Sequence, residues 1–169
     1  VSSVWTGGAY GTGLAVSAIA KGYSGGIDVF MRGSAVAFGN KATGVSLWSQ
    51  AGEYLTGSRL SVGGDVKASG SGAVGVEIYQ ISGGVITSSA TSILGNVITT
   101  ADDATALRQY ISAGSYVYAS SAEIAGLIHV DADKSTGVSW REVAAYNGRT
   151  GLNVGGSINA VGTNATGMD

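Results

Sequence analysis

Two stretches of this chain repeat one another at a fixed offset, and that repetition limits the folds the chain can adopt. LSVGGDVKASG at residues 60–70 recurs 92 residues later as LNVGGSINAVG at residues 152–162. Upstream, the match continues to Trp48 and Trp140. A repeat of this size is too small to bury its apolar face alone, so neighbouring repeats must stack into a continuous core.

A second signature divides the chain further. GIDVF at residues 26–30 resembles GVEIY at residues 75–79, and the 92-residue offset is twice 46. We therefore predict a single β-repeat domain over residues 1–169, built from four quasi-repeats of about 46 residues each. They cover about 1–43, 44–89, 90–133 (a degenerate copy) and 134–169 (a truncated copy).

Within each repeat the apolar residues alternate with other residues, as they do in half-buried strands. Residues 27–32 and 74–79 both follow this pattern, and glycine-rich connectors separate such stretches. The prediction is an all-β fold: a repeat-built β-solenoid, or a stacked antiparallel β-sheet array. A β-sandwich is the alternative, because 46 residues also accommodate four short strands.

One or two short helices are expected within this β-fold. Asp102 and Asp103 are typical caps for a helix that would end at Gly114. Ser139 and Glu142 form a capping-box pattern, which predicts a second short helix.

The composition argues against two classes of partner. Charged residues make up 12% of the chain, against about 25% in ordinary soluble domains. The nine Lys and Arg residues are scattered singly, so no basic stripe is present to bind nucleic acid. The longest apolar stretch, residues 14–20, is too short to span a bilayer, which predicts no membrane insertion.

A possible catalytic motif is GYSGG at residues 22–26, which fits the G-x-S-x-G pattern of a serine hydrolase with Ser24 as the nucleophile. That motif requires a helix after the serine and a histidine partner. A period-two strand follows instead, and the single histidine, His129, lies in an apolar stretch. We predict that the chain is not an enzyme and keep the hydrolase as an alternative.

A calcium loop is a second candidate site. DADKSTGVSWRE at residues 131–142 has oxygen-bearing residues at the spacing of an EF-hand loop, although threonine replaces the glycine of the sixth position. The candidate ligands are Asp131, Asp133, Ser135, Gly137 and Glu142. The alternative is a turn between repeats that carries two solvated aspartates, with no cofactor.

The three tryptophans are a third candidate. If each repeat carries one, Trp5, Trp48 and Trp140 form a row of platforms for sugar rings, and the chain is a carbohydrate-binding module whose partner is a host or cell-surface glycan. The alternative is that each tryptophan is a packing residue of its repeat, since each is flanked by Val or Leu.

Low charge and the absence of proline also bear on association. Natural monomers block exposed strand edges with lysine, proline or other charges, and this chain has few of these residues. We predict an extracellular or cell-surface structural protein that associates with itself by strand addition, as a homo-oligomer or a polymer in a fibre or surface layer.

The stretches GSAVAFGNKATG at 33–44 and GLNVGGSINAVGTNATG at 151–167 resemble the glycine-rich repeats of large bacterial surface adhesins secreted by the autotransporter route. The resemblance covers about a third of the chain. It implies a segment of an elongated, secreted adhesive fibre, trimeric in that family.

Overall fold

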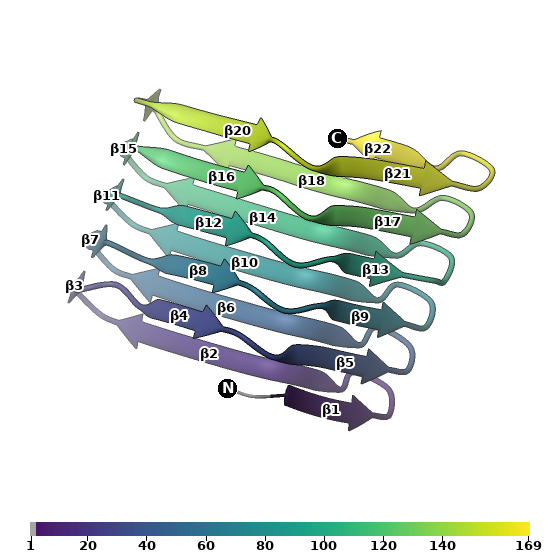
Figure 1. The fold of residues 1–169 in the computed structure, drawn as a ribbon. Coiled ribbons are helices and arrows are strands. Elements are labelled where there is room, and N and C mark those ends of the chain that lie inside the picture. Colours follow the sequence, from purple (N-terminus) through teal and green to yellow (C-terminus); the bar gives the residue numbers. More distant parts are fainter. Residues whose placement is uncertain (1–2) are drawn as a thin grey trace.

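The computed structural model describes residues 3–169, which form 22 strands wound into a β-solenoid with four parallel sheets (Figure 1). Val1 and Ser2 of the predicted first repeat lie outside the described residues. Each coil of the solenoid passes once through every sheet. The solenoid class of the prediction is therefore confirmed, and the sheets are parallel rather than antiparallel.

Sheets A and B hold the six-stranded ladders. Sheet A contains β1 (Ser3–Gly7), β5 (Ser34–Phe38), β9 (Val66–Ser69), β13 (Val97–Thr99), β17 (Leu127–Asp131) and β21 (Ser157–Val161). Sheet B contains β2 (Thr12–Ala20), β6 (Thr43–Ala51), β10 (Val74–Ser82), β14 (Thr105–Ala113), β18 (Thr136–Val143) and β22 (Thr166–Met168).

Sheets C and D hold five strands each. Sheet C contains β3 (Tyr23–Ser24), β7 (Tyr54–Thr56), β11 (Val85–Thr87), β15 (Tyr116–Tyr118) and β19 (Tyr146–Asn147). Sheet D contains β4 (Asp28–Met31), β8 (Arg59–Val62), β12 (Ala90–Ile93), β16 (Ser120–Ile124) and β20 (Thr150–Val154). Sheets D and A lie end to end in one layer with sheet B behind them, and sheet C closes one side (Figure 1).

The step from one coil to the next corrects the predicted period. The N–H of Asn96 donates to Asp65 Oδ1 on the coil before it, a step of 31 residues, and the N–H of Leu127 donates to Asn96 Oδ1 with the same step of 31 residues. Near the C-terminal end, the N–H of Thr163 donates to Asp133 Oδ1 across a step of 30 residues. The pairing within sheet A follows the same steps.

The offset between the two matching stretches therefore spans three coils rather than two of the predicted repeats. Leu60 is followed in its column by Thr91, then by Ala122, and then by Leu152. The predicted quasi-repeat boundaries at about 43, 89 and 133 do not coincide with coils.

The predicted helices are absent from residues 3–169, and both segments are strands instead. The stretch after Asp103 is β14, in which buried and half-buried residues alternate along most of the strand. Ser139 and Glu142 lie inside β18. In both places, hydrogen bonding to parallel strands on either side outweighs a local capping preference, because propensity alone is a weak constraint. With no helix described, none is long and apolar enough to cross a membrane.

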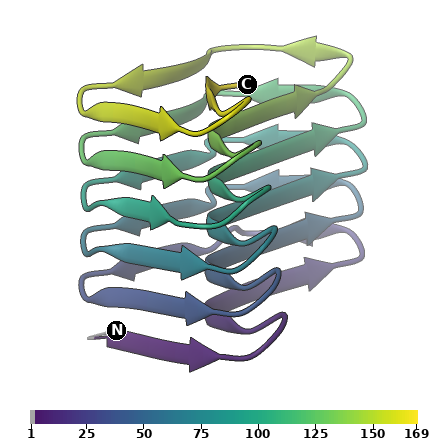
Figure 2. The ribbon, with the colours of Figure 1, turned by 90° about the vertical axis from the view of Figure 1, so that its right-hand side faces the viewer.

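The core is a stack of apolar columns between the two layers. Leu47 and Ile78 of sheet B are in register on successive coils, and both pack in one buried cluster with Leu60 of sheet D. A second cluster lies beside sheet C and includes Leu55, Ile86, Ile111 and Val117. Each side chain inside therefore contacts its equivalents one coil above and below. The coils stack from the N-terminal to the C-terminal end, as the view from the side shows (Figure 2).

Candidate functional site

Ser24 lies in β3 with its side chain buried, in register with Leu55 of the next coil. The serine hydroxyl therefore belongs to the interior rather than to an exposed turn. His129 lies in sheet A, on β17, in register with Ile98 and Asn159. The structure places these two residues in different sheets and in coils far apart, so they do not form a catalytic pair.

The five predicted calcium ligands spread over a corner and a strand. Asp131 ends β17, Asp133 and Ser135 lie in the corner turn, and Gly137 and Glu142 lie on β18. Glu142 lies five residue steps after Gly137 along an extended strand, a distance of roughly 16 Å. A loop that wraps one ion needs these residues to converge, and the strand keeps them apart.

The corner oxygens also have hydrogen-bond partners of their own. The backbone N–H of Thr163 donates to Asp133 Oδ1 at 2.7 Å, and the N–H of Asp133 donates to Asp102 Oδ1 at 3.2 Å. The Ser135 hydroxyl donates to the backbone oxygen of Ala101 at 3.3 Å. These bonds tie each corner to the next. Across residues 3–169, no group of three or more His, Cys, Asp or Glu side chains is placed to hold a metal ion.

The three tryptophans do not form a row. Trp5 lies on sheet A, in register with Val36, and meets Phe38 edge to face at 6.0 Å between ring centroids. Trp48 lies on sheet B in the column of Tyr79. Trp140 also lies on sheet B, but in register with Gln109, in the neighbouring column, which faces the interior.

A different aromatic arrangement, which the sequence analysis did not single out, runs up sheet B. Trp48 stacks on Tyr79 at 5.2 Å, Tyr79 meets Tyr110 at 5.6 Å, and the Arg141 guanidinium lies 5.9 Å from the centre of the Tyr110 ring. We call these four residues the sheet B ladder. Its three aromatic rings recur at equivalent positions of three successive coils, and that regular spacing is the signal that could have revealed it.

The rings of the sheet B ladder contact one another. Trp48 stacks on Tyr79 with 24° between the ring planes, and Tyr110 is tilted by 47° against Tyr79, so Tyr79 has a ring on either side. A sugar ring needs an aromatic face open to solvent. Sheet C carries similar pairs, Tyr23 with Tyr54 at 5.8 Å and Tyr116 with Tyr146 at 5.0 Å. We infer that these rings hold coils together, because each such pair contributes about 0.5–1.5 kcal/mol beyond its buried area.

Replacing Tyr79 with leucine is expected to lower the free energy of unfolding by about 1 kcal/mol. The leucine keeps an apolar side chain between the strands but removes both ring contacts of the central ladder position. Urea denaturation followed by circular dichroism measures the change. Ile81→Leu, a change on the same strand with no ring contact, is the control and should leave stability within about 0.5 kcal/mol. Equal effects of the two changes would contradict the role of the ladder.

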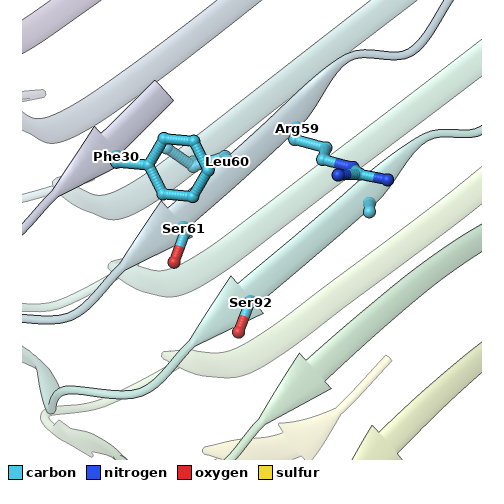
Figure 3. A pocket seen from close by; sticks show the side chains of 6 residues that line it. Phe30, Arg59, Leu60, Ser61 and Ser92 are labelled. Atoms are coloured by element: carbon cyan, nitrogen blue, oxygen red, sulfur yellow. The ribbon is translucent and has the colours of Figure 1, made fainter. Parts of the chain in front are cut away.

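A shallow groove of about 190 Å³ lies on sheet D (Figure 3). Its lining consists of Phe30, Arg59, Leu60, Ser61, Ala90 and Ser92. The outward side chains fall from large to small along the stack: Phe30 is followed by Ser61 and Ser92 on the next two coils, and Arg59 by Ala90. The groove arises from this step in size, which no sequence period predicts.

The two ends of the solenoid are the remaining candidate surface. Strands β1, β2, β3 and β4 form one edge and β19, β20, β21 and β22 the other. These eight strands contain a single charged residue, Asp28. Interior positions that are fully covered elsewhere are only half-buried at the ends: Val16 is half-buried, whereas Leu47, its register partner, is 1% exposed.

Comparison of the chain with protein-family models, with curated proteins and with solved structures found no match.

Proposed function

We propose that this chain is an extracellular structural protein that assembles into a fibre or surface layer, or forms a segment of a repetitive adhesin, by strand addition at the solenoid ends. The observation that carries the proposal is the scarcity of charge in the eight end strands: Asp28 is their only charged residue, and Arg141 and Glu142 lie beside them on the part of β18 that β22 does not cover. Uncharged strand edges accept further strands readily, and soluble proteins usually protect them with charges.

The direction of the strands supports an open assembly. All neighbouring strands pair in parallel, so the last coil of one copy offers the first coil of the next the same kind of edge that each coil offers inside the molecule. The two edges are different surfaces, which makes the contact head to tail. Such contacts extend into filaments unless a rotation closes them into a ring.

The apolar side chains at the ends supply a driving force. Leu14, Val16, Ile27 and Val29 at one end, and Leu152, Ile158 and Ala160 at the other, are partly buried and pack against the core. A second copy over either end would remove their remaining apolar surface from water, worth roughly 25 cal/mol per Å². Backbone hydrogen bonds along the new ladders add to this association.

The other two candidate functions have less support. A carbohydrate-binding row needs three tryptophans on one line, and Trp5, Trp48 and Trp140 lie in three different columns. A serine hydrolase needs an accessible nucleophile, and Ser24 is buried in β3. The extracellular location is part of the proposal and agrees with the low charge and the adhesin-like glycine-rich stretches.

Val16→Lys is expected to weaken self-association by about 100-fold, because assembly would bury an unpaired ammonium group. In the free molecule, this lysine can extend from the open end into water, so the fold should survive. The matched control is Ser17→Lys, which adds the same charge to the same edge strand but on its outward side. Sedimentation velocity over a concentration series, with electron microscopy of the same samples, measures the change.

Association through the end faces predicts different assembly states for these samples. The natural sequence and Ser17→Lys should form elongated particles, and Val16→Lys should form single solenoids. If the natural sequence remains monomeric at all concentrations, or if the two lysine variants behave alike, association through the end faces is overturned. Circular dichroism confirms that each variant retains its β-structure.

A further inference from the structure

We propose that the groove on sheet D binds a single carboxylated sugar residue within a glycan, with Arg59 holding the carboxylate and Phe30 packing against the sugar ring. This site is independent of the end-face proposal, because the groove lies on the outward side of β4, β8 and β12. A free molecule and an assembled one would both present it.

Arg59 points to a ligand with an acidic group. It is exposed and is the only lysine or arginine in the five strands of sheet D. Among the described residues it forms no ion pair, although Asp28 is its register partner on the preceding coil. A guanidinium group offers a planar fork of donors that matches a carboxylate with two parallel hydrogen bonds.

Phe30 supplies an apolar platform beside that charge. Its side chain is 62% exposed, and no aromatic ring in residues 3–169 stacks on it, unlike the rings of the sheet B ladder. One face of a pyranose ring presents C–H groups, which pack well on an aromatic side chain. Phe30 and Arg59 lie on adjacent strands and flank the groove (Figure 3).

Ser61 and Ser92 complete the site with hydroxyl groups. They follow Phe30 up the same outward column, about 4.8 Å apart from strand to strand. Each hydroxyl can donate to or accept from a sugar hydroxyl. A ring-sized ligand would therefore meet an apolar face, two hydroxyl groups and one cation, which is the chemistry of an acidic sugar.

The size and surroundings of the groove restrict the ligand further. Its volume of about 190 Å³ is below the roughly 300–1,000 Å³ of drug-sized sites, and suits one sugar ring. Asp28 lies one strand below Arg59, and Glu123 lies one strand above Ser92 in the same column. These carboxylates repel a run of negative charges, so the site favours an isolated acidic sugar flanked by neutral ones.

The test is a titration of the ¹⁵N-labelled protein with methyl glucuronoside, followed by amide NMR. Methyl glucoside, which has the same ring with a hydroxymethyl group in place of the carboxylate, is the matched ligand, and sodium acetate tests the carboxylate alone. We expect millimolar binding of the glucuronoside, with shifts at Phe30, Arg59, Ser61 and Ser92. Binding of the glucoside and of acetate should be at least about 10-fold weaker.

Two variants and a control assign the contacts. Arg59→Gln should reduce glucuronoside binding at least about 10-fold and remove its preference over the glucoside. Phe30→Ala should weaken both sugars together. Arg149→Gln, the same change at another exposed arginine, should have no effect. The proposal is overturned if no shifts appear at the groove, if the two sugars bind equally, or if Arg149→Gln matches Arg59→Gln.

Discussion

Replacing Gly95 with alanine is expected to lower the free energy of unfolding by about 3 kcal/mol, at the upper end of the range for overpacking a closely packed site. Gly95 lies at the corner between sheets D and A, directly above Gly64 of the previous coil. A Cβ atom at residue 95 would lie 2.2 Å from the Gly64 backbone oxygen and 2.5 Å from its carbonyl carbon. Both atoms belong to the backbone, so no side chain can rotate away to relieve the clash.

Gly63→Ala is the matched control for this prediction, because it makes the same change in the equivalent corner of the previous coil. Its new Cβ would lie 3.4 Å from the nearest atom, the Met31 backbone oxygen, which is an ordinary contact. Leu94 and Ala125 occupy the same place in the next two coils, so a side chain is tolerated there. Stability should change by less than about 0.5 kcal/mol.

Thermal and urea unfolding of the two variants measure the difference. For a chain of this size, a loss of about 3 kcal/mol corresponds to a fall in Tm of about 6–12 °C. If Gly95→Ala unfolds at the temperature of the natural sequence, the coils are not held at the spacing that the structure shows. Equal losses in both variants would mean that glycine is required there for reasons other than close approach of the backbone.

These corners explain why the solenoid was predictable and its period was not. A coil needs inward apolar residues in alternation and small residues at its corners, and both features were visible in the sequence. Outward positions are free to vary: Lys67, Ile98 and His129 follow one another in a single column of sheet A. Adjacent coils therefore share few residue identities, and the best match fell between coils three steps apart.

The spacing of the glycines indicates the length of a coil. Gly64, Gly95 and Gly126 occupy the same corner of three successive coils, and Gly52, Gly83 and Gly114 do the same at another corner. The stacking contacts at these corners leave no room for a side chain, so the spacing of glycine follows the coil. A search for equally spaced glycines would have given the period directly.

The candidate sites also differ in whether the period of the solenoid predicts them. The sheet B ladder follows from the period, because its rings recur at equivalent positions once the length of a coil is known. The groove on sheet D does not, since it depends on how Arg59 and Phe30 differ from the residues that replace them in later coils. The motif match at Ser24 falls on a strand, and the match at 131–142 falls on a corner that leads into a strand. Neither stretch has the backbone that its motif requires.

Thr91→Val is expected to lower the free energy of unfolding by about 2 kcal/mol, because it strands a buried amide group. The Thr91 hydroxyl on sheet D donates to Gln109 Oε1 on sheet B at 2.9 Å, across the interior. Both side chains are at most 3% exposed, and Gln109 Nε2 has no partner among the described residues. Without Thr91, the buried amide would lose its one hydrogen bond while remaining in the core.

The double variant Thr91→Val with Gln109→Leu separates the cost of the stranded amide from any cost of the valine itself. Leucine at 109 would continue the column of Leu47 and Ile78, and no buried polar group of the pair would remain. Replacing both partners by apolar groups of similar shape is close to neutral, so the double variant should regain most of the stability that Thr91→Val loses. Urea unfolding of the natural sequence, both single variants and the double variant completes the cycle. If Thr91→Val alone is neutral, or if the double variant is as unstable as the sum of the two single ones, the hydrogen bond across the interior contributes nothing to holding sheets B and D together.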